Sequence, residues 1–215
     1  MSIQEISKKC ADSLRSFTKE NYDIKLKAAH AHELVAAYFG YKSKNSMLAD
    51  ARLPISRLED ADIIVMIDDV EINNRRDDLQ SISDLLPDSY KLGEPFYTAL
   101  FSDLTLYKSE FPPFRSFKGF TQFYIENSKR WNSIFKHIED IKLDHIVEVD
   151  SQKDFVKISV IHTSKNSRNE YLDLGETILT LERVAGRIGY KEPRMDIIQK
   201  HGKARRLMKL SKTSK

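Results

Sequence analysis

DIKLKAAHAHELVAAYFGYKSKNSMLAD (residues 23–50) is the stretch whose local structure can be assigned position by position. Asp23 is placed to cap a helix whose apolar residues recur at three- and four-residue steps as far as Tyr38. Gly40 follows that helix, at a position where a positive φ is common and where glycine adopts it without steric cost. Ser43 can then cap a second, short helix. The stretch therefore predicts a helix, a glycine turn and another helix.

One use of such a unit is a helix-turn-helix whose second helix enters the major groove of DNA. The side chains placed to contact bases or phosphates are Lys42, Lys44 and Asn45. The predicted second helix has only about two turns, which is shorter than most recognition helices. A plain helical hairpin is therefore the competing interpretation, and the sequence leaves both open.

Residues 23–50 resemble a module with the pattern HELxAAxxGYKS, found in uncharacterised bacterial proteins that often belong to mobile elements. The resemblance is confined to that stretch of the 215-residue chain. It implies an accessory or regulatory role rather than a particular reaction.

A second segment repeats part of this sequence pattern. ELVAAYFGYK (33–42) and ERVAGRIGYK (182–191) align without a gap and share Glu, Val, Ala, Gly, Tyr and Lys in register. Internal duplication is one explanation, and convergence of two unrelated helices on the same Gly-Tyr cap is the other. Both explanations predict a helix that ends at Gly189.

Composition bounds the class of protein. A chain of 215 residues, 40% of them hydrophobic and 31% charged, is typical of a globular protein with one domain or two small ones. No apolar run approaches the roughly 18 residues that a transmembrane helix needs, and the N-terminal sequence lacks a signal-peptide pattern. Cys10 is the only cysteine, which excludes an internal disulfide and a cysteine-rich zinc site. We expect a cytoplasmic protein without a membrane partner.

Charge is unevenly distributed along the chain. Residues 58–94 hold eleven acidic and three basic side chains, whereas residues 200–215 hold seven Lys or Arg and no acid. The acidic segment can serve as a surface for a basic protein partner, bind a divalent cation, or form a solvated face paired with its own arginines. The residues assigned to the protein-binding alternative are Asp68, Asp69, Asp77 and Asp78.

The basic C-terminal segment is the strongest electrostatic indication of a nucleic-acid partner. Its cations can follow phosphates, with an affinity that falls steeply with salt and carries little sequence information. The candidate contacts are Lys203, Arg205, Arg206 and Lys209. A solubilising tail, or one that folds onto the acidic residues 58–94, is the alternative.

Catalytic motifs are weak throughout the chain. Arg130 and His137, with six residues between them, resemble the Arg-His element of HEPN-type ribonucleases, which implies His137 as the general acid or base and Arg130 as the stabiliser of phosphorane charge. His32 and Glu33 begin an HExxH pattern, but Ala36 stands where the second histidine is needed. Since phosphate-binding and nucleophile-elbow motifs are also lacking, we expect no metal and no cofactor.

These patterns together predict an α+β fold. The N-terminal two-thirds are expected to be mostly helical, followed by a small antiparallel meander and terminal helices over residues 181–188 and from residue 195 onward. The expected organisation is a helical region (1–110), a Pro-rich linker or docking loop (111–117), a long aromatic helix with sheet and helix (118–199), and a basic tail (200–215).

The leading functional interpretation is a non-enzymatic, regulatory binding protein that engages nucleic acid or a nucleic-acid-handling protein. The alternatives are the metal-independent ribonuclease and an acidic protein-interaction module or inhibitor. A homo-oligomer is compatible with each of them.

Overall fold

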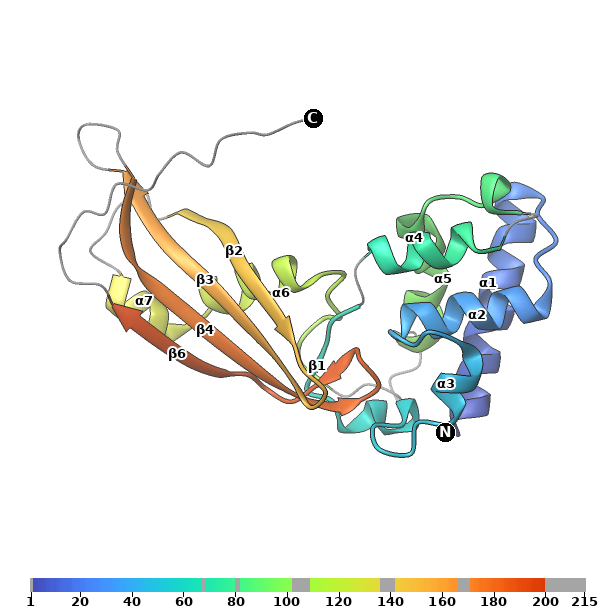
Figure 1. The fold of residues 1–215 in the computed structure, drawn as a ribbon, viewed down its shortest axis with the longest axis horizontal. Helices are drawn as coiled ribbons and strands as arrows, with labels where there is room; N and C mark the ends of the chain where they lie inside the picture. Colours follow the sequence, from blue (N-terminus) through green and yellow to red (C-terminus); the bar gives the residue numbers. More distant parts are fainter. Residues whose placement is uncertain are drawn as a thin grey trace. The chain divides into compact units, whose positions relative to one another are not determined.

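The computed structural model describes residues 2–66, 69–79, 82–101, 109–135, 142–165 and 171–199. It has an α+β fold with helices and an antiparallel sheet, as the sequence predicts (Figure 1). The chain divides into two compact units. Unit 1 comprises Met1–Phe120 and Glu182–Glu192, and unit 2 comprises Thr121–Leu181 and Pro193–Lys215.

Unit 1 is built mainly from helices. They are α1 (Ile3–Tyr22), α2 (Ala28–Tyr38), α3 (Lys44–Leu48), α4 (Asp69–Asp77) and α5 (Ser89–Phe101), with 3₁₀ segments η1 (Ile55–Asp60) and η2 (Ser83–Leu85). Helix α1 packs against both α2 and α5 (Figure 1). Leu14, Leu34 and Phe96 are fully buried in the core that these helices enclose. Burial of these apolar faces is the main stabilising contribution in this unit.

The helix–glycine turn–helix unit is confirmed. Gly40 has a φ of 79°, its N–H donates to Ala37 at 2.8 Å, and the N–H of Tyr41 donates to Ala36 at 2.8 Å. These two bonds form a Schellman motif, which satisfies the free carbonyls at the end of α2. Ser43 then caps α3 through a reciprocal capping box.

The predicted start of α2 is wrong. Asp23 lies in the left-handed region with a φ of 56°, and its N–H donates to Lys19 at 3.1 Å, so it ends α1 instead of beginning α2. Aspartate tolerates this conformation better than most residues, and its carboxylate pairs with the side chain of Lys19. Asp23, which was expected to cap the start of α2, therefore caps the end of α1.

The sheet of unit 1 is short. Strand β1 (Ile63–Ile64) pairs antiparallel with β5 (Gly189–Tyr190), and β5 pairs antiparallel with the last residues of β4 (Tyr171–Ala185). On the other side of β1, Phe114 exchanges backbone hydrogen bonds of 2.8 Å with Ile64 and Met66. The Pro-rich residues 111–117 belong to unit 1 and are anchored there by this pairing.

The helix expected over residues 181–188 is wrong. Residues as far as Ala185 belong to β4, Gly186 begins the turn with a φ of 53°, and β5 follows. Backbone pairing of Arg183 with Tyr190 and of Ala185 with Gly189 makes this a β-hairpin. The convergence of two helices on one cap is therefore also wrong, because only the first aligned segment is a helix.

Unit 2 contains a four-stranded sheet. Its strands follow the order β2 (Lys142–Ser151), β3 (Phe155–Lys165), β4 and β6 (Arg194–Gln199). The antiparallel pairing of β2 with β3 confirms that part of the predicted meander. The helix expected from residue 195 onward is wrong over β6, which pairs antiparallel with β4 from Gly175↔Gln199 to Thr180↔Arg194. Gly175 permits this pairing, since a Cβ there would lie 2.2 Å from the carbonyl oxygen of Ile198.

The predicted single aromatic helix is two helices, α6 (Phe117–Glu126) and α7 (Lys129–Phe135). Ser128 separates them because its Oγ accepts from the Trp131 N–H at 3.2 Å and so caps α7. Trp131 and Phe135 pack against His162 of β3, in the core of unit 2. Trp131 and Phe135 are therefore core residues, whereas Phe123 on α6 is 37% exposed.

Candidate nucleic-acid interface

The turn between α2 and α3 carries the three residues that the sequence nominated for nucleic acid. Lys42 and Asn45 are exposed, and Lys44 is half-buried. The carbonyl oxygen of Lys42 accepts a hydrogen bond from Nη2 of Arg75, which ties the turn to the last residues of α4. The backbone that carries Lys42, Lys44 and Asn45 is therefore held by this hydrogen bond and by the capping box of α3.

Glu33 has a structural role next to this turn. Its two carboxylate oxygens accept from the N–H of Lys44, at 3.4 and 3.3 Å, at the start of α3. A carboxylate in this position satisfies free N–H groups and complements the helix dipole. Glu33, the glutamate of the partial HExxH pattern, therefore already accepts a hydrogen bond from the backbone of α3.

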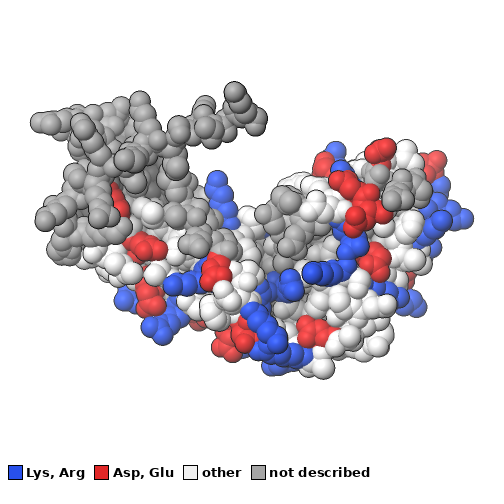
Figure 2. Space-filling model, viewed as in Figure 1, with Lys and Arg blue, Asp and Glu red and all other residues white. Residues whose placement is uncertain are grey.

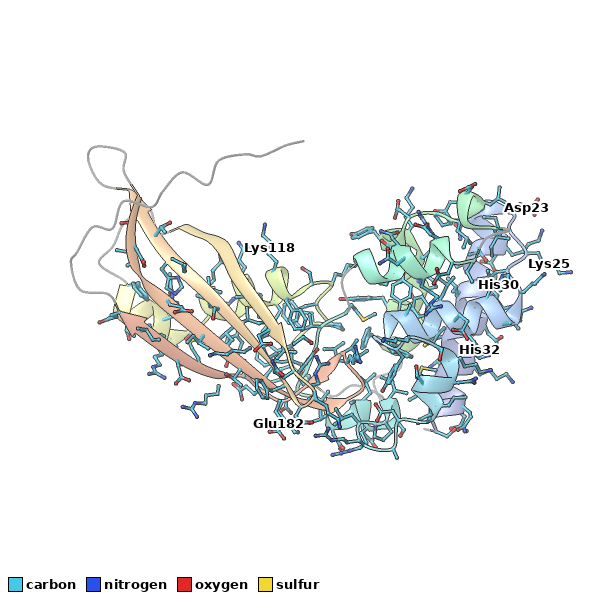
Figure 3. All side chains as sticks on the ribbon, viewed as in Figure 1. Asp23, Lys25, His30, His32, Lys118 and Glu182 are labelled. Atoms are coloured by element: carbon cyan, nitrogen blue, oxygen red, sulfur yellow. The ribbon has the colours of Figure 1, made fainter. Side chains whose placement is uncertain are left out.

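The two histidines of α2 are His30 and His32 (Figure 3). Nδ1 of His32 lies 2.9 Å from Oγ of Ser7, which joins α2 to α1. Burial, together with the charge of Lys44, lowers the pKa of His32 below its usual value. In the described parts of the chain, no three His, Cys, Asp or Glu side chains come together to hold a metal ion.

The Ser7–His32 pair was not singled out from the sequence, and its geometry invites comparison with a nucleophile and its base. The side chain of Ser7 is only 1% exposed, because it faces the interior between α1 and α2. A substrate carbonyl cannot reach a hydroxyl in this position. The pair therefore serves helix packing.

Two further cations lie at the same turn. Arg75 comes from α4 and reaches the turn through its guanidinium. Arg187 comes from the β4–β5 turn; its backbone N–H donates to Phe39 at 3.4 Å, and its charge helps to lower the pKa of Asp50. Together with Lys42, Lys44 and Asn45 they define a surface that we call the basic turn. Figure 2 shows both Lys or Arg atoms and Asp or Glu atoms on the visible face of unit 1. Sequence reasoning missed Arg187 because it placed this residue on a helix.

Nearby carboxylates balance part of this charge. Asp50 accepts from Tyr41 Oη at 2.9 Å and from the N–H groups of Arg52 and Leu53 at 3.0 and 3.1 Å. Burial by itself raises the pKa of Asp50, but these hydrogen bonds outweigh it and lower the pKa. Since its oxygens are engaged within the loop, Asp50 stays ionised and holds the backbone behind the basic turn.

Asp77 and Asp78, the two nominated acidic residues whose side chains the structure describes, are paired locally. Asp78 lies 3.3 Å from Arg75, and Asp77 lies 3.5 Å from Arg76. This is the arrangement expected of a solvated face with internal arginine partners. The side chains of Asp68 and Asp69 lie outside the described residues, as do the tail residues Lys203, Arg205, Arg206 and Lys209.

Arg130 has a backbone partner within unit 2. Its Nη1 donates to the carbonyl of Met195 at 3.0 Å, which joins α7 to β6. His137, its proposed catalytic companion, lies outside the described residues. The described contact gives Arg130 a role in holding the edge strand of the sheet.

His162 is a fully buried histidine of unit 2. Its Nε2 lies 2.6 Å from Thr177 Oγ1 and 3.4 Å from Trp131 Nε1. The indole N–H can only donate, so Nε2 is an acceptor and the ring is neutral. Burial lowers the pKa of His162 to about 4, in keeping with a core residue that stays uncharged.

Comparisons with known proteins add no family to this picture. The sequence matches no protein-family model, and neither the curated proteins nor the solved structures gave a match. The described helices include none that is both long enough and apolar enough to cross a membrane. Function must therefore be argued from the residues of the chain itself.

Proposed function

We propose that this protein is a cytoplasmic, non-enzymatic binding protein that engages nucleic acid through the basic turn. The observation that carries the proposal is that Lys42, Lys44, Arg75 and Arg187 belong to three parts of the sequence whose backbones are joined by hydrogen bonds next to one turn. No ion pair is recorded for Lys42, Lys44 or Arg187 within the described residues. Clustered cations of this kind attract phosphates and promote association with a polyanion.

The expected contacts are to phosphates rather than to base edges. Helix α3 has five residues, and the carboxylate of Glu33 occupies its first N–H group. A helix this short offers few side chains to the major groove, unlike the recognition helices of sequence-specific proteins. Phosphate contacts position a protein on nucleic acid without selecting a sequence. The basic residues 200–215 would extend the same kind of binding.

An accessory or regulatory role follows from this kind of binding. A protein that holds phosphates without reading bases can recruit or shield a segment of nucleic acid for other proteins. The resemblance of residues 23–50 to a module of bacterial mobile-element proteins points to the same role. The buried Cys10 thiol, whose pKa burial raises to about 12, is compatible with a reducing cytoplasm.

The test is a fluorescence-anisotropy titration of labelled duplex DNA and single-stranded RNA. We expect the triple variant Lys42→Gln, Lys44→Gln, Arg187→Gln to bind roughly tenfold more weakly, because three charge-assisted contacts are lost and tenfold corresponds to about 1.4 kcal/mol. A second arm removes residues 200–215 and is expected to weaken binding further. Gel analysis of the RNA after each titration tests the ribonuclease alternative.

A matched control removes the same charge elsewhere in unit 1. Lys8, Lys25 and Lys27 are exposed, and the last two precede α2, whereas the basic turn follows it (Figure 3). The 11 residues of α2 separate the two places by about 16 Å. Replacing these three lysines by glutamine should leave most of the affinity. Equal losses in the two triple variants would contradict a localised interface.

A further inference from the structure

Unit 1 contains a second candidate site, separate from the basic turn. It is a shallow pocket between α5 and the 111–117 loop, with a cavity of about 30 Å³ that becomes about 350 Å³ when the open solvent at its mouth is counted. Its inner wall is formed by Tyr38, Met66 and Ile72, which are 3%, 5% and 1% exposed. Tyr90, with 56% of its surface exposed, and the exposed Arg115 stand at the rim.

Arg115 is held in position by its neighbours. It follows Phe114, whose backbone is fixed to Ile64 and Met66 by hydrogen bonds of 2.8 Å. Its guanidinium carbon lies 4.0 Å from the ring centroid of Tyr90 and 5.1 Å from that of Tyr97. Stacking on two rings fixes the plane of the guanidinium and reduces the entropy that it would lose on binding a ligand.

The hydrogen-bonding capacity of this arginine is largely unused in the described structure. A guanidinium carries five N–H donors, and one contact is recorded, from Nη1 to the carbonyl of Tyr90 at 3.4 Å. None of the described residues that line the pocket is acidic. A cation with free donors beside an apolar wall is a suitable partner for a planar oxyanion.

The tyrosines present rings rather than hydroxyls to the pocket. Oη of Tyr38 donates to the carbonyl of Ser89, and Oη of Tyr97 donates to the carbonyl of Pro113. These bonds satisfy the polar ends of both side chains and fix their rings. A ligand in the pocket therefore meets tyrosine rings and the side chains of Met66 and Ile72.

We propose that this pocket binds a small planar aromatic ring that carries an oxyanion, either phosphate or carboxylate. The ring would lie against the apolar wall beside Tyr90 and Tyr97, and the oxyanion would accept hydrogen bonds from Arg115. A cationic ligand is disfavoured because Arg115 already occupies the rim. Nucleoside phosphates and aromatic carboxylates share this chemistry.

The proposal does not depend on the basic turn. The residues of the pocket and those of the basic turn form separate sets, so each set can be altered while the other is kept. The pocket proposal fails if its own variants change nothing. The proposed function fails if the Lys42, Lys44 and Arg187 variants change nothing.

The experiment is an NMR titration of the full ¹⁵N-labelled chain with two probes in separate arms, uridine 5′-monophosphate and benzoate. Uridine, benzamide and inorganic phosphate are the controls, because each lacks either the charge or the ring. We expect saturable shifts of pocket resonances with at least one probe. Binding should weaken about tenfold in Arg115→Gln, because the charged donor to the oxyanion is lost.

Lys118→Gln is the matched control, because Lys118 is an exposed cation three residues from Arg115 (Figure 3). It should bind the probe as the unaltered chain does. Saturation by the nucleotide alone would identify a nucleotide site, and saturation by benzoate alone would identify a site for aromatic acids. The proposal is overturned if neither probe saturates, if Arg115→Gln binds with unchanged affinity, or if inorganic phosphate alone binds as tightly as the probes.

Discussion

Two aligned segments of unit 1, residues 33–42 and 182–191, share six letters in register and adopt different structures. The first is the second half of α2 with its glycine cap, and the second is the end of β4, a turn and β5. The two segments also meet: the N–H of Arg187 in the second donates to Phe39 in the first. Each contributes cations to the basic turn, so the proposed interface depends on their different structures.

The difference is concentrated at a few positions. Ala37 in the first segment corresponds to Gly186 in the second, which turns the chain with a φ of 53°. Glycine within a helix costs about 1 kcal/mol relative to alanine, which favours a turn at that point. The shared glycine also has two uses, because Gly40 supplies a positive φ whereas Gly189 supplies space. Identical letters thus satisfy different physical requirements.

Among variants of these glycines, Gly186→Val should cause the largest loss of stability. A β-branched residue is strained at a φ of 53°, and its Cβ would lie 3.2 Å from Cδ1 of Ile55. We expect the free energy of unfolding to fall by about 3 kcal/mol, from backbone strain and overpacking together. Urea unfolding followed by far-UV circular dichroism measures this change. A loss below about 1 kcal/mol would contradict the hairpin turn.

Gly189→Ala should have the next largest effect, about 2 kcal/mol, because the added methyl group has no space. Its Cβ would lie 2.9 Å from Cβ of Ala185, 3.0 Å from the Ala185 carbonyl oxygen and 3.2 Å from Cβ of Ala61. The double variant with Ala185→Gly removes the closest of these contacts and should recover part of the loss. The same urea titration decides this, and absence of any recovery would show that the cost has another origin.

Gly40→Ala should lower the free energy of unfolding by less than either of these variants, about 1 kcal/mol, because the penalty is confined to the left-handed conformation. Gly40→Asn should cost less still, since asparagine tolerates that conformation at the end of a helix. At position 189, asparagine should be no better than alanine, because the requirement there is space. Thermal unfolding of the four variants checks this, and the same ranking at both positions would remove the distinction between the two glycines.

Sequence periodicity was informative where structure is decided locally. The spacing before Gly40, with Ser43 after it, was enough to predict the end of α2, its cap and α3, but not where α2 begins. The spacing of Leu181, Val184 and Ile188 is equally helical, yet backbone pairing in the sheet decides the conformation there. Strand β6 was missed for the same reason, because its partner lies earlier in the chain.

The residues of the candidate site divide in the same way: those close together in the sequence could be predicted, and those brought in by the fold could not. Lys42, Lys44 and Asn45 were found because they are neighbours in the chain. Arg75 and Arg187 join them only through the tertiary fold, and no local pattern marks them. The residues that line the pocket come from α2, α4, α5, the 111–117 loop and Met66, and no local pattern groups them.

The central claim is that Arg187 of the hairpin and the lysines after α2 bind phosphates together. The most direct test is the salt dependence of nucleic-acid binding by Arg187→Gln, compared with Lys191→Gln in the same segment. Lys191 is a fitting control because it already donates to the Asp60 carbonyl at 2.7 Å and lies 3.6 Å from the Asp62 carboxylate. We expect the slope of log K against log salt to fall by about 1 for Arg187→Gln and to stay unchanged for Lys191→Gln. An unchanged slope for Arg187→Gln would contradict the account.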